Sequence, residues 1–350
     1  MILWEIPMEI GIVGLGQSGK STLFQIMTGV RSSEIYGEST VRGIARVPDG
    51  RFENLVSTFK PAKVSPAQIP FTDVMATGED AWDSIRQALG SADGFVHIVD
   101  AFTASNPAEV VKNYRKLTDE LIISDLMIVE KRLERLAKVQ KASLKPDEAQ
   151  HLALLPKAKE ILDEGRPLRG WELGETEMRS LRGFAFWTLR PELVVINVRD
   201  DNPSFTDEFA NTAETTSPVI GINCMMEAEI AELNPEHRLE FLKSIGATEP
   251  AFERIVQTTF TLLERICYFT VGEDEVKAWV IPAGSTAPRA AAAIHKDFER
   301  GFIKAEVVSY DDFVECGETL AGAKAAGKQR LEGKEYVVQD GDIISFRFNV

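Results

Sequence analysis

The sequence has little cysteine and no long hydrophobic run. Its three cysteines, among 350 residues, lie far apart and form no C-x-x-C pair. This usage is typical of free thiols in a reducing compartment and gives no reason to expect a zinc site. The apolar N-terminus lacks the basic region and the cleavage site of a signal peptide, and nothing else approaches the length of a membrane span. We therefore expect a cytoplasmic protein without a membrane segment.

The chain also lacks an excess of positive charge. Its 39 basic and 54 acidic side chains leave a formal net charge of −15. A surface with this charge repels nucleic acids and anionic membranes, so contact with either requires a local basic patch. The composition, 44% hydrophobic and 27% charged, is that of a globular protein, and the length predicts two or three compact units.

Short hydrophobic runs recur along the chain and predict a parallel β-sheet. They are continuous apolar segments, as expected for strands that are covered on both faces. Segments with helical spacing separate them, which favours an α/β fold with a mostly parallel sheet. The predicted strands span residues 10–14, 69–74, 94–102, 192–198 and 217–224.

The alternation of strands and helices stops between residues 106 and 190. Here leucine and valine recur at steps of three and four on both sides of a polar stretch at residues 141–150. The pattern predicts an antiparallel helical hairpin, since structureless loops of this length are rare. A pair of ordinary core helices is the alternative. The hairpin would be an insertion, with residues 1–105 and 191–265 forming the two parts of the sheet domain.

The C-terminal segment, residues 266–350, has a different pattern. Short strands are predicted at residues 268–272, 276–284, 304–313, 334–339 and 342–350, with one helix at residues 287–302. A few short strands with one helix indicate a small α+β module.

A glycine-rich stretch near the N-terminus carries the clearest functional motif. Residues 14–21 read G-L-G-Q-S-G-K-S, which fits the phosphate-loop pattern G-x-x-x-x-G-K-[ST] at every fixed position. The stretch follows a predicted strand and opens a predicted helix, the context in which backbone N–H groups surround phosphates. Lys20 would place its charge between the β- and γ-phosphates, and Ser21 would bind Mg²⁺. The predicted nucleotide contacts are Gly16, Gln17, Ser18, Gly19, Lys20, Ser21 and Thr22, and a turn that binds nothing is the alternative.

Asp73 and Thr40, which both follow the phosphate loop in the sequence, are candidates for the metal site. Asp73 ends a core strand, where its carboxylate can reach Mg²⁺, and it opens D-x-x-A where switch GTPases have D-x-x-G. Ala76 keeps a backbone N–H for sensing the γ-phosphate but loses the left-handed conformations of glycine. Thr40, in the preceding segment with Ser39, offers a hydroxyl that would complete the Mg²⁺ shell. A capping carboxylate and an ordinary loop threonine are the alternatives.

These residues give one candidate catalytic and metal site. Lys20 and Asp73 are the candidate catalytic residues, and Ser21, Thr40 and Asp73 are the candidate ligands of Mg²⁺.

The strand at residues 192–198 leads into an N-x-x-D motif, Asn197 to Asp200. Loops at the carboxyl ends of parallel strands are where α/β nucleotide-binding sheets contact the base. In the N-K-x-D pattern the Asp accepts hydrogen bonds from guanine, but here Val198 replaces the lysine that packs along the base. Cys224 and Met225, after the next strand, would present backbone N–H groups and apolar surface to the purine. A plain loop carboxylate and core methionines are the alternatives.

Together these motifs resemble the YchF subgroup of Obg-like ATPases, which are P-loop NTPases of the TRAFAC class. The resemblance covers nearly the whole chain, and its most specific part is "VKAWVIPAGSTAPRAAAAIHKDFERGFIKAEVVSYDDF" with "GKEYVVQDGDIISFRFNV". It implies a G domain with a helical-hairpin insertion and a C-terminal TGS module of ubiquitin-like fold. It also implies ATP hydrolysis without the usual catalytic glutamine, and association with ribosomes. From the motif residues themselves we expect the hydrolysis to depend on Mg²⁺ and to be slow.

The sequence departs from the family pattern at the base loop and after Asp73. The family usually has Glu, associated with accepting ATP, where this chain has Asp200, so ATP and GTP both stay open as substrates. The stretch from Asp73 to His97 is several residues shorter than in the family and lacks a glycine-rich run, and Thr77 stands where a hydrophobic residue is usual. These differences leave open whether the switch region still supports hydrolysis.

One stretch of the acidic chain is basic. Residues 131–145 hold six basic side chains and one acid, a net charge of +5, against −20 for the remainder. At the tip of the predicted hairpin, this patch suits contact with the phosphate backbone of ribosomal RNA, and no aromatic residues interleave for base stacking. A solvated helix face is the alternative. The residues are Lys131, Arg132, Arg135, Lys138, Lys141 and Lys145.

The sequence therefore predicts a monomeric P-loop NTPase that binds ribosomes according to its nucleotide state. The alternative is a nucleotide-binding regulatory module with little or no hydrolysis that binds the ribosome or protein partners. A small-molecule kinase is a third interpretation, for which the sequence offers no acceptor site or lid.

Overall fold

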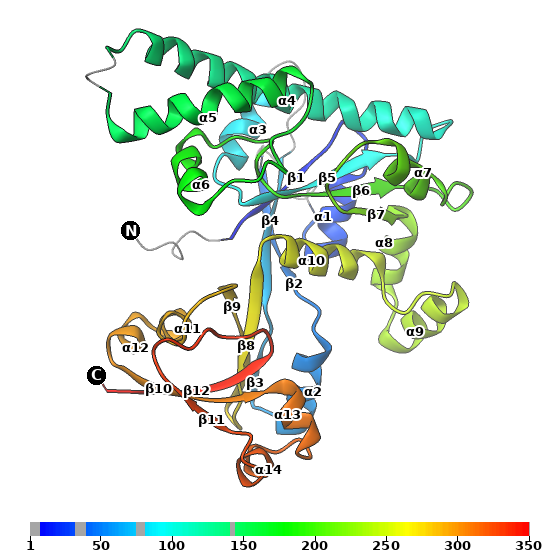
Figure 1. The fold of residues 1–350 in the computed structure, drawn as a ribbon. Coiled ribbons are helices and arrows are strands. Elements are labelled where there is room, and N and C mark those ends of the chain that lie inside the picture. Colours follow the sequence, from blue (N-terminus) through cyan, green and yellow to red (C-terminus); the bar gives the residue numbers. More distant parts are fainter. Residues whose placement is uncertain (1–7, 32–39, 75–80, 141–143, 350) are drawn as a thin grey trace. The chain divides into compact units, whose positions relative to one another are not determined.

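The computed structural model describes residues 8–31, 40–74, 81–140 and 144–349. These residues form two compact units (Figure 1). The first unit combines residues 9–43 with residues 71–255. The second combines residues 44–70 with the chain from Val256 onwards. The division of the sequence into four segments stays a prediction.

The first unit is built on a six-stranded sheet with the order β2-β4-β1-β5-β6-β7. Every pair of neighbours from β4 to β7 is parallel, which confirms the predicted α/β fold. The strands are β1 (Ile10–Val13), β2 (Thr40–Arg46), β4 (Gln68–Val74), β5 (Gly94–Asp100), β6 (Glu192–Asn197) and β7 (Val219–Ile222). Five of them coincide with the predicted strands, and every residue of β6 is buried, as a continuous apolar run requires.

Helices connect these strands and cover the sheet (Figure 1). One helix each lies between β1 and β2, between β4 and β5, and between β6 and β7, whereas three helices and a 3₁₀ turn lie between β5 and β6 and three helices follow β7. The helices are α1 (Lys20–Thr28), α3 (Ala81–Leu89), α4 (Pro107–Ala137), α5 (Pro146–Asp163), α6 (Glu175–Leu181), η3 (Arg182–Phe184), α7 (Phe205–Thr212), α8 (Cys224–Glu232), α9 (Pro235–Ser244) and α10 (Ala251–Leu262).

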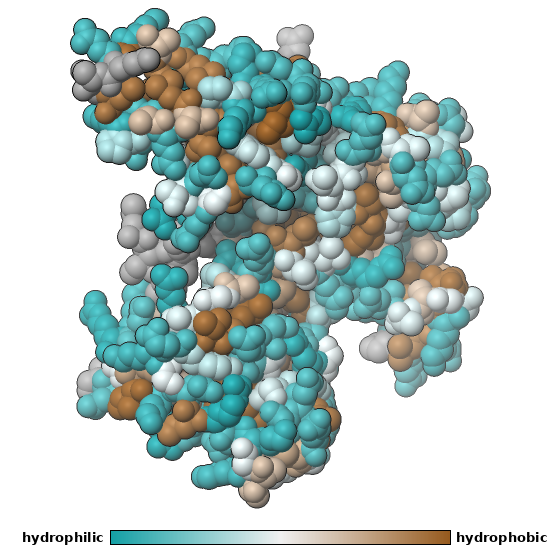
Figure 2. All heavy atoms as spheres, in the orientation of Figure 1, coloured by the Kyte–Doolittle hydropathy of each residue, from teal (hydrophilic) through white to brown (hydrophobic). Residues whose placement is uncertain are grey.

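The two longest helices, α4 and α5, pack side by side as an antiparallel hairpin (Figure 1). Arg132 meets Glu148 at 3.7 Å, whereas Glu130 meets Lys159 at 2.8 Å, so the helices run in opposite directions. Their contact is apolar, and Figure 2 shows a hydrophobic strip along the hairpin between hydrophilic side chains. Leu152, one of the leucines whose spacing predicted the second helix, does not belong to this contact, because it is 37% exposed.

A buried carboxylate attaches α4 to the chain that leads into β6. Asp125 accepts hydrogen bonds from the backbone N–H groups of Trp187 and Thr188, at 3.0 and 2.8 Å, and from the Thr188 hydroxyl at 2.8 Å. Asp125 is fully buried, and burial raises its pKa. Three donors on one carboxylate fix the middle of a 31-residue helix to the sheet domain.

The second unit has its own six-stranded sheet, in the order β11-β10-β12-β8-β9-β3. The sheet is mixed, because β12 pairs with β8 and β3 with β9 in parallel, whereas the other neighbouring strands pair antiparallel. Its elements are α2 (Gly50–Phe59), β3 (Lys63–Ser65), β8 (Arg265–Thr270), β9 (Glu275–Pro282), α11 (Ala287–Ile294), α12 (Lys296–Arg300), β10 (Phe302–Ser309), α13 (Tyr310–Glu315), α14 (Leu320–Ala325), β11 (Arg330–Glu332) and β12 (Asp342–Phe348). The early segment with α2 and β3 therefore folds with the C-terminal module.

Three details of the C-terminal prediction were wrong. The strand predicted at residues 304–313 ends at Ser309, directly before α13 begins. Residues 334–339 form no strand, because Gln339 N–H and the Tyr336 hydroxyl both donate to the Asp342 carboxylate and bend the chain into a turn. The single predicted helix is divided at His295, whose backbone is extended and whose Nδ1 accepts from Asp297 N–H to cap α12. Among the helices in the described ranges, none is both long and apolar enough to cross a bilayer.

A buried ionic network surrounds Glu192 at the start of β6. Its carboxylate accepts from Arg169 Nη1 at 2.6 Å and from the Ser217 hydroxyl at 2.8 Å, and lies 3.1 Å from His97 Nδ1. Burial alone would raise the pKa of Glu192, but Arg169 and His97 outweigh it and hold that pKa at about 2. The network thus joins β5, β6 and the segments that precede β6 and β7.

We expect Glu192 to make the stability of the first unit depend on acid. Its folded-state pKa of about 2 lies below the ordinary value of 4.5, so its stabilisation is present above pH 4.5 and is lost as pH falls towards 2. The loss is about 3 kcal/mol in the free energy of unfolding. In urea unfolding between pH 7 and pH 3, Glu192→Gln should be less stable at pH 7, because Arg169 loses its partner, and should show a flatter pH dependence. The exposed Glu208→Gln is the control, and parallel profiles for Glu192→Gln and the unchanged chain would contradict this role.

Candidate nucleotide-binding site

The loop between β1 and α1 has a backbone shape that depends on glycine. Gln17 and Gly19 have φ values of 63° and 102°, in the left-handed region. A Cβ on Gly19 would lie 2.7 Å from Asn197 Nδ2, and one on Gly14 would lie 2.4 Å from Ile98 O. No side chain is tolerated at such distances, so the loop follows this path only with glycine at both positions.

The start of α1 presents hydrogen-bond donors without a side-chain cap. Gly19, the residue before the helix, offers no side chain to the first N–H groups, which are therefore available to an anion. Lys20 folds back on the loop, where its Nζ donates to Gly14 O at 3.0 Å and Leu15 O at 2.8 Å. Burial lowers the pKa of Lys20, and the nearby Asp73 carboxylate opposes this shift. Ser18 is fully buried, and its Oγ has no hydrogen-bond partner among the described residues.

The hydroxyl of Ser21 meets the carboxylate of Asp73 across the site. Ser21 Oγ donates to Asp73 Oδ2 at 2.8 Å, which joins the first turn of α1 to the end of β4. Asp73 is fully buried, whereas Ser21 is exposed. The structure therefore brings together a hydroxyl, a carboxylate and an ammonium group. Thr40 begins β2, and within the described ranges no contact ties it to Ser21 or Asp73.

Asn197 connects the loop to the far side of the sheet. It ends β6, is 6% exposed, and its Nδ2 donates to Ser18 O at 3.1 Å. Its Oδ1 accepts from Cys224 N–H, the first residue of α8, at 3.2 Å. One amide side chain thus fixes the phosphate loop and the α8 start with its donor and its acceptor.

Asp200 and the start of α8 lie beside Asn197 at the end of the sheet. Asp200 is exposed, and its Oδ1 accepts from Asn223 Nδ2 at 2.7 Å. Asn223 Oδ1 in turn accepts from the backbone N–H of Met225 and Met226, so these amides, like that of Cys224, are used inside the chain. The Met225 side chain remains 61% exposed.

Asn223 is the site residue that sequence reasoning missed. The sequence did contain a signal for this role, because Asn is a preferred residue directly before a helix, where it caps the first N–H groups. The motif pattern drew attention to Asp200 and not to the amide that holds it.

The basic residues of the hairpin are mostly free of partners. Lys131, Arg135, Lys138 and Lys145 are exposed and form no ion pair within the described part of the chain. Arg132 differs, because it is half-buried beside Glu148 and its Nη2 lies 3.3 Å from His151 Nδ1. Lys141 lies outside the described residues, as do the candidate switch residues Ser39, Ala76 and Thr77.

Comparisons with known proteins give one family over the full chain. The family model described as "YchF-GTPase_C: Protein of unknown function (DUF933)" matches residues 265–349. The chain is 38% identical to the "Ribosome-binding ATPase YchF" of Pasteurella multocida, with 98% of this chain and 99% of that protein covered. It is also 38% identical to the protein of the same name from Bacillus subtilis, with 99% and 100% covered.

A solved structure agrees with these sequence matches. The YchF GTPase of Schizosaccharomyces pombe superposes with a TM-score of 0.82 at 25% identity, over 97% of each chain. The similarity therefore covers both units and is not confined to the phosphate-loop motif.

Proposed function

This chain belongs to the YchF family, and we propose that it binds a purine nucleoside triphosphate with Mg²⁺, hydrolyses it, and associates with ribosomes. The observation that carries the proposal is the contact of Ser21 with Asp73 beside Lys20, at the start of α1. Relatives along the whole chain are named ribosome-binding ATPases. We further propose that the protein acts as a monomer in the cytoplasm, where ribosomes are found.

A bound triphosphate would accept hydrogen bonds from groups that now donate to oxygens of the loop itself. Lys20 Nζ contacts two loop carbonyl oxygens, and a triphosphate would offer it charged oxygens instead, which are stronger acceptors. The first N–H groups of α1, and the Ser18 hydroxyl, which has no hydrogen-bond partner in the described ranges, also favour binding of an anion here. Catalysis would then rest on positioning and on neutralising the γ-phosphoryl charge with Lys20.

The oxygen ligands at the site suit Mg²⁺. Mg²⁺ is bound in such sites through one or two protein oxygens together with substrate phosphates, and Ser21 with Asp73 supplies a hydroxyl and a carboxylate at 2.8 Å from each other. Bound there, the ion would neutralise charge on the β- and γ-phosphate oxygens. We propose Ser21 and Asp73 as its ligands or near neighbours, and Thr40 as a ligand that joins when the triphosphate is bound.

The purine would lie against Asn197, Asp200 and the start of α8. The buried Val198 replaces the lysine of guanine-specific loops, and one Asp200 oxygen is engaged by Asn223, so Asp200 cannot offer both oxygens freely to guanine. The exposed Met225 side chain offers apolar surface to either purine, and Cys224 contributes through its backbone tie to Asn197. We therefore favour ATP over GTP as the substrate.

The helical segment at residues 106–190 would carry the ribosome contact. Four basic residues near its tip are exposed and form no ion pair within the described ranges, and they suit phosphate oxygens of ribosomal RNA: Lys131, Arg135, Lys138 and Lys145. Arg132 contributes less, because Glu148 lies beside it. We propose that residues 266–350 form a TGS module, which accords with the mixed sheet of the second unit.

Replacing Lys20 tests the phosphate site. We expect Lys20→Met to weaken ATP binding about 100-fold or more, because a charge-assisted contact to the phosphates is lost. Calorimetry would measure the binding, and Mg²⁺-dependent phosphate release with and without ribosomes would measure turnover. Lys112→Met, at an exposed position on α4, is the control. Unchanged affinity of Lys20→Met would contradict the site, whereas binding without any phosphate release would favour the regulatory module.

Nucleotide choice is tested at Asp200. Calorimetric titration of ATP and GTP should give tighter binding of ATP, and Asp200→Glu should raise the ratio of ATP to GTP affinity about tenfold, since the longer side chain loses the geometry of guanine contacts. Asp201→Glu is a matched control, because Asp201 is the exposed neighbour paired with Arg199. An unchanged ratio in Asp200→Glu would exclude this carboxylate as the determinant.

Charge reversal on the hairpin tests the ribosome contact. Changing Lys131, Arg135 and Lys138 together to Glu should weaken ribosome binding and lower the dependence of log affinity on log salt by up to about 3. The control changes three exposed lysines elsewhere on the hairpin, Lys112, Lys116 and Lys157, to Glu. Sedimentation with ribosomes at several salt concentrations gives both quantities, and equal losses in the two variants would refute a local contact.

A further inference from the structure

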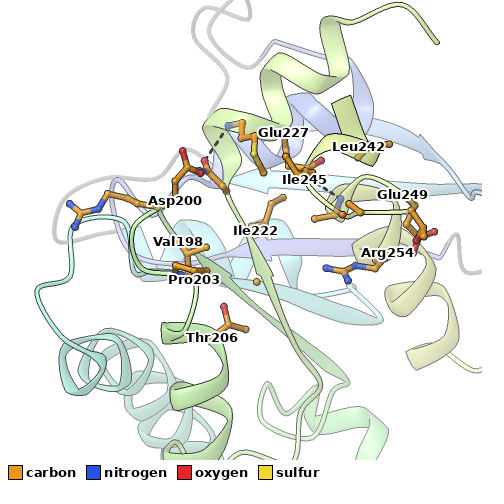
Figure 3. A pocket seen from close by; sticks show the side chains of 18 residues that line it. Val198, Asp200, Pro203, Thr206, Ile222, Glu227, Leu242, Ile245, Glu249 and Arg254 are labelled. Carbon is orange, nitrogen blue, oxygen red and sulfur yellow. Dashed lines mark hydrogen bonds between the residues drawn. The ribbon is translucent and has the colours of Figure 1, made fainter. Parts of the chain in front are cut away.

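The first unit holds a pocket that the phosphate site does not use. Its volume is about 740 Å³, within the range of small-molecule sites. The ends of β6 and β7, the first turn of α8 and the chain from the end of α9 to the start of α10 enclose it (Figure 3). Val198, Ile222 and Leu242 form a buried apolar wall, and Ile245, 46% exposed, stands at the opening.

One buried polar group in the lining lacks part of its hydrogen bonding. Glu227 is 3% exposed, and its Oε1 accepts from Ala251 N–H at 2.8 Å. Its Oε2 is buried and has no hydrogen-bond partner among the described residues. Burial raises the pKa of Glu227, whereas the backbone N–H groups of Ala251 and Phe252 and the charges of Arg254 and Arg238 oppose that shift. A buried acceptor of this kind calls for a donor from outside the chain.

The charged residues around the pocket indicate which kind of molecule would supply the donor for Glu227. Glu227 is the one ionisable side chain that is buried in the described lining. Glu249 and Arg254 lie at one end and Asp200 at the other (Figure 3). Arg254 is exposed and has no ion pair in the described part of the chain, so the interior is acidic and the basic group stands at the surface.

We propose that this pocket binds a small organic molecule with an apolar body and a cationic nitrogen head, whose N–H groups donate to Glu227. The apolar body packs on Val198, Ile222 and Leu242, and a polar or anionic tail reaches Arg254 at the rim. An anion would meet Glu227 without a donor to offer, so a phosphate-bearing ligand does not suit the interior. The proposal does not rest on the nucleotide site, although Asp200 and Asn223 line one end of the pocket.

Three benzene derivatives of the same size serve as probes. Benzamidine is cationic and carries N–H groups that match a carboxylate, benzamide is neutral, and benzoate is anionic. Calorimetry or ligand-detected NMR with the full chain should show saturable benzamidine binding in the range of about 1–10 mM, as suits a fragment of this size. Benzamide and benzoate should bind at least about tenfold more weakly, because they lack the charge-assisted contact.

Two variants in the lining and one control variant locate the binding. Glu227→Gln keeps an oxygen for Ala251 N–H but replaces the free acceptor with a donor, and should weaken benzamidine binding about tenfold or more. Glu229→Gln makes the same change of charge at an exposed position of α8 and should bind like the unchanged chain. Ile245→Ala, at the exposed rim, keeps the test informative if Glu227→Gln fails to fold, and should weaken binding severalfold.

The proposal fails if benzamidine shows no saturable binding up to about 50 mM. It also fails if Glu227→Gln or Ile245→Ala binds benzamidine as well as the unchanged chain. Displacement of benzamidine by saturating ATP or GTP would place the probe at the purine position, and that result too would overturn a separate site.

Discussion

The arrangement of the candidate site depends on one buried amide, that of Asn197. It ties the phosphate loop to the start of α8 through Ser18 O and Cys224 N–H, at the end of a fully buried strand. A carboxylate would lack the donor and an aliphatic side chain would lack both groups, and an unsatisfied buried partner costs about 1–3 kcal/mol. The close approach of this amide is also what excludes a Cβ at Gly19. The loop shape, the start of α1 and the position of Lys20 follow from that contact.

Elsewhere in the first unit, buried carboxylates likewise join distant segments of the chain through hydrogen bonds. Asp125 gathers three donors and attaches a long helix, and Glu192 gathers a guanidinium, an imidazole and a hydroxyl around the start of β6. In both cases the chain supplies the partners from segments far apart in sequence. Glu227 is different, because one of its oxygens is left without a partner among the described residues. That contrast, and not the size of the pocket alone, distinguishes it from a packing defect.

The sequence predicted what local pattern encodes and missed what distant pairing creates. The parallel strands follow from continuous apolar runs, and the helical hairpin from its spacing of leucines. The phosphate loop follows from a motif whose glycines have a steric reason. By contrast, β3 is three residues long and largely exposed. No hydrophobic pattern in the sequence therefore predicts its pairing with β9, which lies more than two hundred residues later. Likewise Asn223 reaches Asp200 only because β6 and β7 are neighbours.

The membership of residues 44–70 in the second unit has a consequence for the integrity of the C-terminal module. The family model begins at residue 265, but the sheet continues into β3, and Arg51 bonds Asp340 at 2.8 Å while Phe52 packs near Phe269. A fragment that begins at residue 265 would leave one edge of β9 with unpaired backbone groups, and such an edge can pair with other chains. The module is therefore discontinuous in sequence, and a fragment that keeps its whole sheet has to include β3 as well as the C-terminal residues.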